Sequence, residues 1–308
     1  MVCRIFTLAL VPVLSSLLLA ETKPENVAAT VNGEAIRLDE VDAALRRALP
    51  ADAPLTAAQT KRLRAEILDE LIDEKLLIQF LARSGPKVPP ADIERAMQAL
   101  TASLRKQKKT LADHLRETGQ TEQQVREQWM RVLQLQRLID ARATEAELRK
   151  YFADHKEVFE NATVRAAHIV VRLGPNATPG ERAAAVEKLA RLRKEIVAGT
   201  IDFAAAAKKH SVCPSAKDGG DLGEIARKDS IVDEAFAAAA FALKVGEVSE
   251  PVETEMGLHL IRVSDRKAGT PTTFEKSIER VRDLYAEDVR RSMLEKLKKD
   301  ARIQISLP

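Results

Sequence analysis

The sequence predicts an α+β protein in which a small mixed domain is inserted into a mainly helical one. Charged residues make up 31% of the 308 residues and aromatic residues only 4%, which favours a helix-rich protein over an all-β one. Apolar residues recur at helical spacing on both sides of the middle of the chain, whereas the middle itself alternates strand-like and helix-like segments. A chain of this length can hold two domains, each with its own core.

The pattern of residues 1–20 predicts a secretory signal peptide. Arg4 is followed by an apolar run from Ile5 to Ala20, and the polar chain begins at Glu21. The alternative is an uncleaved N-terminus that tethers the protein to a membrane. The run is shorter than the roughly 20 apolar residues that a membrane-spanning helix needs. We therefore expect an exported protein without stable membrane insertion, located in a bacterial periplasm.

Charge argues against a nucleic-acid-binding protein, and cysteine content argues against a disulfide-stabilised one. The 49 basic and 46 acidic residues are interspersed and give a formal net charge of +3, so the sequence predicts no nucleic-acid partner. Cys3 would leave with the signal peptide, and Cys213 would then be the single cysteine of the mature protein. A framework of internal disulfides is therefore excluded.

Residues 21–160 predict the first part of the helical domain. Small apolar residues around Asn32-Gly33 predict two short strands joined by a tight turn, and Asp39 is expected to cap the helix that follows. A broad apolar face predicts a long helix over residues 56–83, which ends at Ser84-Gly85-Pro86. Further helices are expected over residues 89–105, 111–119, 121–141 and 144–155.

Residues 268–308 predict the second part of the helical domain. Thr273 is expected to cap a helix whose apolar side extends to Leu297, and Ile303 begins a short closing strand. An apolar stripe of that length needs a surface to cover it, and so do the N-terminal helices. We therefore expect the C-terminal helix to pack on the N-terminal domain, with residues 161–267 inserted between the two parts.

Residues 161–267 predict a compact α+β domain. A buried strand is expected over residues 164–171, followed by helices over 178–199, 202–209 and 232–243 and by strands over 248–252 and 259–263. Three short motifs stand out within this order. They are Ala-Ala-His168-Ile-Val-Val, then His210-Ser-Val-Cys213-Pro-Ser-Ala-Lys-Asp-Gly-Gly-Asp-Leu-Gly, and then Met256-Gly-Leu-His259-Leu-Ile.

In their order along the chain these motifs resemble the parvulin family of peptidyl-prolyl cis/trans isomerases. The flanking helices and the segment from Ala28 to Arg37 are similar to the exported chaperones of the SurA and PrsA group, including trigger-factor-like proteins. The resemblance implies an isomerase of X–Pro bonds that also acts as a folding chaperone. Its partners would be unfolded or extended proline-containing polypeptides. It implies no cofactor and no metal, and it leaves a homodimer open.

The same resemblance assigns roles to individual residues. His168 on the first strand and His259 on the last correspond to the family's paired histidines, and Cys213 to its active-site cysteine or aspartate. These three are the expected catalytic residues. Phe236 falls where a large apolar side chain lines the proline pocket. The other expected substrate-binding residues are Phe241, Met256 and, in a loop of unusual length, Ile231 and Val232.

Each of these residues also has a second interpretation. The two histidines are alternatively structural, orienting the pocket rather than acting directly. Cys213 with a histidine base would be a nucleophile, and the three residues together would be a zinc site, although their wide spacing lacks a short-range ligand pair. Met256 and the acidic Asp233-Glu234 depart from the usual family pocket. They favour the alternative that this domain is a catalytically weak peptide-binding module.

Overall fold

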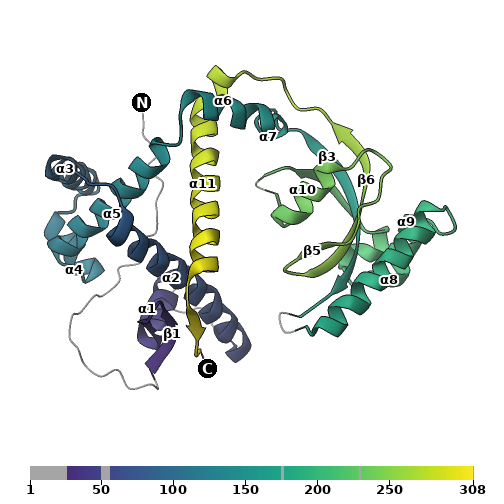
Figure 1. Cartoon of the computed structure of the whole chain (residues 1–308), viewed down its shortest axis with the longest axis horizontal. Helices are drawn as coiled ribbons and strands as arrows, with labels where there is room; N and C mark the ends of the chain where they lie inside the picture. The colour runs from purple at the N-terminus through teal and green to yellow at the C-terminus, as the bar shows by residue number, and fades with distance from the viewer. Residues whose placement is uncertain (1–25, 50–55, 175–176, 229, 308) are drawn as a thin grey trace. The chain divides into compact units, whose positions relative to one another are not determined.

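The computed structural model describes residues 26–49, 56–174, 177–228 and 230–307, and it contains two compact units (Figure 1). The first, here called the N/C unit, combines the described residues up to Thr144 with those from Leu284 onward. The second, the central unit, is Glu145–Asp283. The predicted signal peptide lies outside the described residues. Within the described ranges, none of the helices combines the length and apolar character that crossing a membrane requires.

A three-stranded antiparallel sheet ties the beginning of the N/C unit to its end. Strands β1 (Val27–Val31) and β2 (Glu34–Arg37) form the predicted hairpin. Asn32 and Gly33 take φ values of 53° and 89° in its turn, a backbone conformation that favours these two residue types. The predicted closing strand, β7 (Ile303–Ile305), pairs with the free side of β1, which gives the order β2-β1-β7.

Helices make up the rest of the N/C unit. Capping boxes from Thr56 and Thr121 start two of them, because each threonine and the glutamine three residues later exchange hydrogen bonds with backbone N–H groups. The prediction that Asp39 caps the first helix is wrong. Arg37 occupies the cap position, and Asp39 lies in the first turn, 2.6 Å from the guanidinium of Arg37. The helices are α1 (Leu38–Ala48), α2 (Ala57–Ser84), α3 (Pro90–Lys106), α4 (Leu111–Thr118), α5 (Glu122–Asp140) and the part of α11 (Phe274–Asp300) from Leu284 onward.

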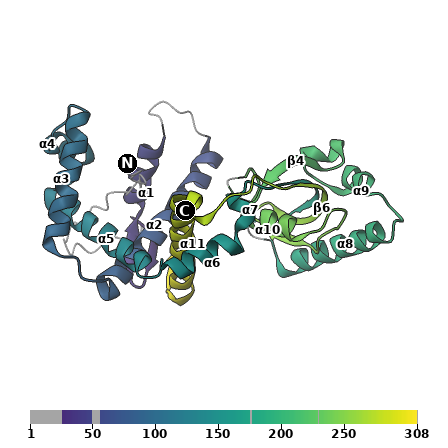
Figure 2. The same cartoon turned by 90° about the horizontal axis from the view of Figure 1, so that it is seen from above.

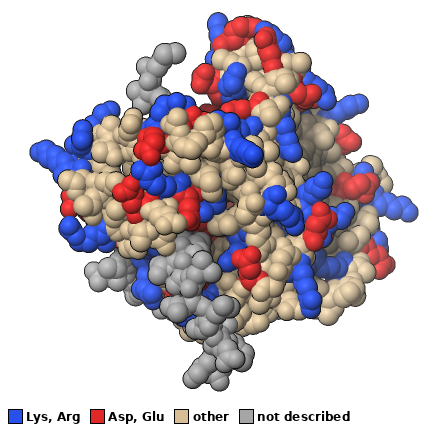
Figure 3. All heavy atoms as spheres, turned by 60° about the vertical axis from the view of Figure 1, so that its left-hand side comes forward, with Lys and Arg blue, Asp and Glu red and all other residues tan. Residues whose placement is uncertain are grey.

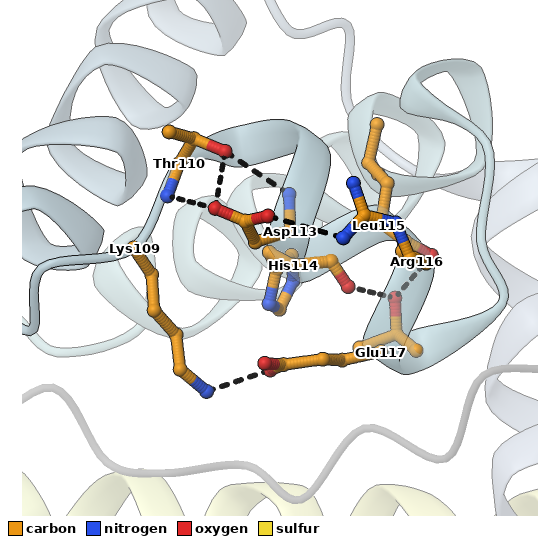
Figure 4. Close-up of polar contacts among 8 residues, drawn as sticks. Lys109, Thr110, Asp113, His114, Leu115, Arg116 and Glu117 are labelled. Atoms are coloured by element: carbon orange, nitrogen blue, oxygen red, sulfur yellow. Dashed lines mark hydrogen bonds and ion pairs between the residues drawn. The ribbon is translucent and has the colours of Figure 1, made fainter.

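Helix α4 shows how local sequence fixes a short element (Figure 4). The Asp113 carboxylate accepts from the N–H and hydroxyl of Thr110, while Thr110 accepts from the N–H of Asp113. Gly119, at a φ of 67°, ends the helix in the left-handed conformation. Lys109 and Glu117 then form an ion pair of 2.7 Å across it. Figures 1 and 2 show α3 and α4 side by side.

The last part of α11 covers the apolar faces of α2 and α5. Val289 and Met293 pack on a cluster formed by Leu81, Leu135 and Ile139. Further along the chain, Leu297 and Ile303 pack against the core of β1, β2, α1 and α2. The ammonium group of Lys298 lies 3.2 Å from Asp69 and 2.7 Å from Asp73, both on α2. The C-terminal residues are therefore part of the core of the N/C unit.

The central unit is built on one antiparallel sheet of order β4-β3-β6-β5. Three elements were not predicted, namely α7, the 3-10 helix and β4. The strand expected over residues 248–252 is a single bridge, Val248 to Arg262, followed by β5. The elements are α6 (Glu145–Asp154), α7 (Lys156–Phe159), β3 (Thr163–Arg172), α8 (Pro179–Val197), α9 (Phe203–His210), a 3-10 helix (Pro214–Asp218), β4 (Asp221–Ala226), α10 (Glu234–Ala242), β5 (Val252–Thr254) and β6 (Gly257–Lys267).

Helices cover both faces of this sheet. Figure 1 shows α8 and α9 on one side of it and α10 on the other. Ile169 and Leu260 belong to the core beneath α8 and α9, whereas Val164 and Ile261 belong to the core beneath α10. Neighbouring residues of a strand point to opposite faces. Strand β3 is covered on both faces, so its successive residues there are apolar. The exception is His168, which lies on the α10 side.

Candidate active site

His168 and His259 meet on the face of the sheet that α10 covers. The register pairs His168 with Ile261 and Val170 with His259 across β3 and β6. Opposed residues of an antiparallel pair share a face, and so do residues two apart on one strand, so the histidines are diagonal neighbours. Their Nδ1 atoms lie 3.1 Å apart, and the rings stack with centroids separated by 5.2 Å.

Burial sets the charge state of this pair. His168 is 4% exposed and His259 is 2% exposed, and burial lowers the pKa of each to about 4. Both rings are therefore neutral at pH 7. Their Nδ1–Nδ1 contact is then a hydrogen bond in which one ring donates and the other accepts. The pair fixes its own tautomers without an acidic partner.

Thr254 completes the hydrogen bonds of His259. Its Oγ1 lies 2.8 Å from Nε2 of His259 and also accepts from the N–H of Met256 at 3.1 Å. On His168 the corresponding Nε2 is buried and forms no hydrogen bond with any described residue. A buried nitrogen without a partner is costly, and Nε2 of His168 is the one ring nitrogen of the pair that no described residue satisfies.

Phe236 closes the other side of the histidine pair. Helix α10 starts at the N-cap residue Asp233, and Phe236 lies in its first turn, 2% exposed. Its ring meets both imidazoles edge-on, at centroid distances of 5.7 Å from His168 and 5.5 Å from His259. Three flat rings from β3, β6 and α10 therefore form one compact aromatic cluster.

The segment that carries Cys213 is anchored to strand β3 beside His168. The N–H of Val212 donates to the carbonyl of Val170 at 3.1 Å, and the hydroxyl of Ser211 accepts from the N–H of Val170. At the other end of the segment, the carbonyl of Gly220 accepts from the N–H of His168 at 2.9 Å. The half-buried thiol of Cys213 lies between these two anchors along the chain.

Gly220 permits the second of these anchors. Its φ of 85° lies in the left-handed region, and a Cβ atom there would lie only 2.2 Å from the carbonyl oxygen of His168. A larger residue would push the Cys213 segment away from the strand that carries the first histidine.

Comparisons with known proteins agree with this geometry. Residues 168–265 match the PPIC-type PPIase domain, and residues 2–150 match the SurA-like N-terminal domain. The foldase protein PrsA of Caldanaerobacter subterraneus is 30% identical over 259 residues, which cover 79% of this chain and 73% of that protein. The chain belongs to the PrsA foldase family. It is therefore a parvulin-type peptidyl-prolyl isomerase that also acts as a folding chaperone.

Two further proteins are similar to this PrsA-family chain. Chaperone SurA of Hahella chejuensis is 29% identical over 222 residues, which cover 70% of this chain and 50% of the relative. The crystal structure of the peptidylprolyl isomerase PrsA from Bacillus anthracis is 21% identical, covers 76% of this chain and 96% of that one, and superposes with a TM-score of 0.44.

The remaining predicted pocket residues of this PrsA-family chain lie in three different environments. Val232 is half-buried and packs on the core that holds Phe236. Ile231 is 88% exposed and Met256 is 51% exposed, so both lie in solvent in this structure. Phe241 is 7% exposed, and its ring lies 5.4 Å beneath the guanidinium of Arg266, near the end of α10.

Thr254 is the member of the site that sequence reasoning missed. It lies on β5, a strand of only three residues that the sequence did not separate from the segment before it. One feature of the sequence could have indicated it, because Thr254 comes directly before the tight turn that leads into the strand of His259. The pairing of β5 with β6 brings the hydroxyl of Thr254 to His259, and the sequence does not show that pairing.

Proposed function

We propose that the cluster of His168, His259 and Phe236 is the floor of the proline pocket, in which X–Pro bonds of unfolded exported proteins are isomerised. The observation that carries this proposal is the contact of two neutral, buried imidazoles with one buried aromatic ring. An apolar surface of this kind suits the uncharged proline ring. The unpartnered Nε2 of His168 offers one polar group within it.

The chemistry requires no bond to be formed or broken by the protein. Rotation about the X–Pro bond has a barrier of about 18–20 kcal/mol because the amide has partial double-bond character. The twisted transition state has lost this resonance and is less polar than the planar amide. A pocket that holds the ring among apolar groups and excludes water therefore favours the twisted form over the planar one.

Each polar residue of the site then has a positioning role in this proposal. The histidines fix each other's tautomers, Thr254 fixes the orientation of His259, and Gly220 keeps the Cys213 segment against β3. Cys213 borders the pocket as a small, partly apolar group. A nucleophile is not needed, because no acyl group is transferred.

The test is an isomerisation assay on unphosphorylated tetrapeptides with different residues before proline. The full-length mature protein is expected to accelerate exchange between cis and trans forms, followed by NMR line exchange so that no protease is needed. Peptide binding without acceleration would support the alternative function, a catalytically weak parvulin-like domain that serves as a peptide-docking module. The exposed Met256 and Ile231 are the observations that favour that alternative.

We further propose that the protein works in a bacterial periplasm on extended, proline-containing chains, and that the N/C unit holds them. The apolar run before Glu21 and the single cysteine left after its removal support export. On the face drawn in Figure 3, basic and acidic side chains are interspersed, which argues against nucleic acid as a partner. Sedimentation of the mature protein would decide between a monomer and the homodimer that the sequence leaves open.

A further inference from the structure

Asp233 holds a carboxylate in a fixed position at the start of α10. Its Oδ1 accepts a hydrogen bond of 2.8 Å from the N–H of Ala235, which is the usual role of an N-cap residue. Phe236 lies three residues later in the same first turn. The negative charge is therefore built into the element that supplies the aromatic ring of the pocket, and the side chain itself is exposed to solvent.

The charge of Asp233 acts on His259, one of the two histidines. Burial is the main cause of the low pKa of His259, with the neighbouring His168 also lowering it, and Asp233 acts in the opposite direction. Among the described residues, Asp233 is the one carboxylate that acts on His259 in this way. Its neighbour Glu234 instead pairs with Arg227 at 2.7 Å, so the adjacent basic residue is already occupied. No described side chain forms an ion pair with Asp233.

Two exposed apolar side chains belong to the two segments that flank the site, the one before α10 and the one between β5 and β6. Ile231 precedes Asp233 by two residues and is 88% exposed. Met256, 51% exposed, is tied through its N–H to Thr254, whose hydroxyl contacts His259. Exposed apolar side chains on segments that also present a fixed anion suit one kind of ligand, a long aliphatic stem with a cationic end.

We propose that Asp233 makes this isomerase prefer polypeptide segments in which Lys or Arg flanks the proline. The stem of the basic residue would lie on Ile231 and Met256 while its charge meets the Asp233 carboxylate. This inference rests on the proposed function, because it assigns the proline ring to the cluster of Phe236 and the two histidines. It adds a substrate class that the cluster itself does not define.

The experiment compares kcat/KM for peptides of one frame that carry Lys, norleucine or Glu before the proline, and for a second series with the same residues after it. Norleucine has the stem of Lys without its charge. In at least one series, kcat/KM for the Lys peptide should exceed kcat/KM for the norleucine peptide by about two- to fivefold at low ionic strength, as expected for an exposed ion pair. The advantage should shrink between about 20 mM and about 500 mM NaCl because salt screens it.

The deciding variant is Asp233→Asn, since asparagine caps a helix as well as aspartate does but carries no charge. The Lys-to-norleucine ratio should fall to about one in this variant. Asp202→Asn is the matched control, because Asp202 caps α9 through the N–H groups of Ala204 and Ala205 on the opposite face of the sheet. That control should keep the wild-type ratio.

The outcomes separate this inference from the proposed function. An active wild-type enzyme with equal kcat/KM for Lys, norleucine and Glu in both series would overturn the role of Asp233 alone. So would a Lys preference that survives Asp233→Asn or disappears equally in Asp202→Asn. If no peptide is isomerised, the proposed function fails. The same peptides, labelled and titrated by fluorescence anisotropy, would then show whether Asp233 still selects basic segments for binding.

Discussion

The Nδ1 atom of His168 lies 3.1 Å from the Nδ1 atom of His259, so a single hydrogen atom joins the two rings. A second proton on this contact would set two N–H groups against each other in a buried site. Burial makes both rings resist protonation, and the neighbouring His168 lowers the pKa of His259 further. The pair is a buried polar element that carries no net charge at neutral pH.

We predict that the central unit loses stability as the pH falls from about 6.5 to about 4. Burial lowers the pKa of both histidines from 6.5 to about 4, so in this window the unfolded chain takes up protons that the folded chain refuses. The loss is about 1.4 kcal/mol per pH unit for each histidine that stays neutral. Thermal unfolding at several pH values would measure it, and NMR titration of the ring protons would give the two pKa values directly. Ring signals that titrate near pH 6.5 in the folded protein would contradict the prediction.

Phe236→Ala should lower kcat/KM by more than about tenfold, equivalent to about 1.4 kcal/mol of transition-state binding, because it removes the ring that contacts both histidines. It should also cost about 3–5 kcal/mol of stability, so activity must be measured where the variant is folded. Phe241→Ala is the control, since it empties a buried site on the same helix beside Arg266. Equal losses of activity in the two variants would show that Phe241 also contributes to the pocket, as the sequence comparison implied.

Cys213→Ser and Cys213→Asp should both keep measurable isomerase activity. The reason is that Cys213 lies in a segment held by backbone hydrogen bonds to β3, which neither substitution removes. Mass spectrometry of the wild-type protein incubated with peptide aldehydes would provide an independent check. A stable thiohemiacetal on Cys213, together with loss of all activity in the serine variant, would establish covalent catalysis instead.

Glu74→Gln should stabilise the N/C unit at pH 8 and change little at pH 5. Burial raises the pKa of Glu74 to about 7, although the charges of Arg131, Lys75 and Arg47 oppose this shift. The folded protein therefore holds a proton there that the unfolded chain releases above about pH 4.5, and stability declines as the pH rises from 4.5 through 7. With allowance for screening, the expected gain at pH 8 is about 1–2 kcal/mol.

Glu70→Gln is the control for this effect, because Glu70 is exposed on the same helix. Urea unfolding followed by the fluorescence of Trp129, which lies on α5 in the same unit, would report both variants. A gain of similar size at both pH values, or in both variants, would mean that the burial of Glu74 is not the cause.

A shortened chain that joins residues 26–144 directly to residues 284–308 should fold cooperatively and slow the aggregation of an unfolded client without isomerase activity. Val289, Met293 and Leu297 supply part of its core, and β7 supplies one of its three strands. Circular dichroism during urea unfolding would measure its stability. If residues 26–144 alone were equally stable and equally active in holding the client, the proposal of one shared core would be wrong.

Helix boundaries were predictable where the sequence itself supplies the end of the element. Thr56, Thr121 and Thr178 start helices as expected because a polar residue three positions later completes each capping box. Strand β4 was missed for the opposite reason. Asp221 and Gly223 read locally as a turn, and only pairing with β3 makes the segment extended.

The candidate site was predictable only in part. The motifs around His168 and His259 carried a family resemblance, and their shared face follows from the strand register. The position of Thr254 could not be derived, because it depends on which residue of a short strand opposes His259. Nor could exposure of Ile231 and Met256 be read from the sequence, since apolar residues in a predicted pocket are expected to be covered.

The pairing of β7 with β1 has a consequence for the order of folding. The backbone N–H of Asn32 donates to Arg302, and the side chain of Asn32 accepts from the N–H of Arg302, a contact that spans 270 residues. During synthesis the central unit is complete before β7 exists, and it can fold while β1 still has an unpaired edge. We therefore expect the N/C unit to close last, around a loop that has already folded. A newly made chain would then expose its own apolar helices for a time and need protection from aggregation.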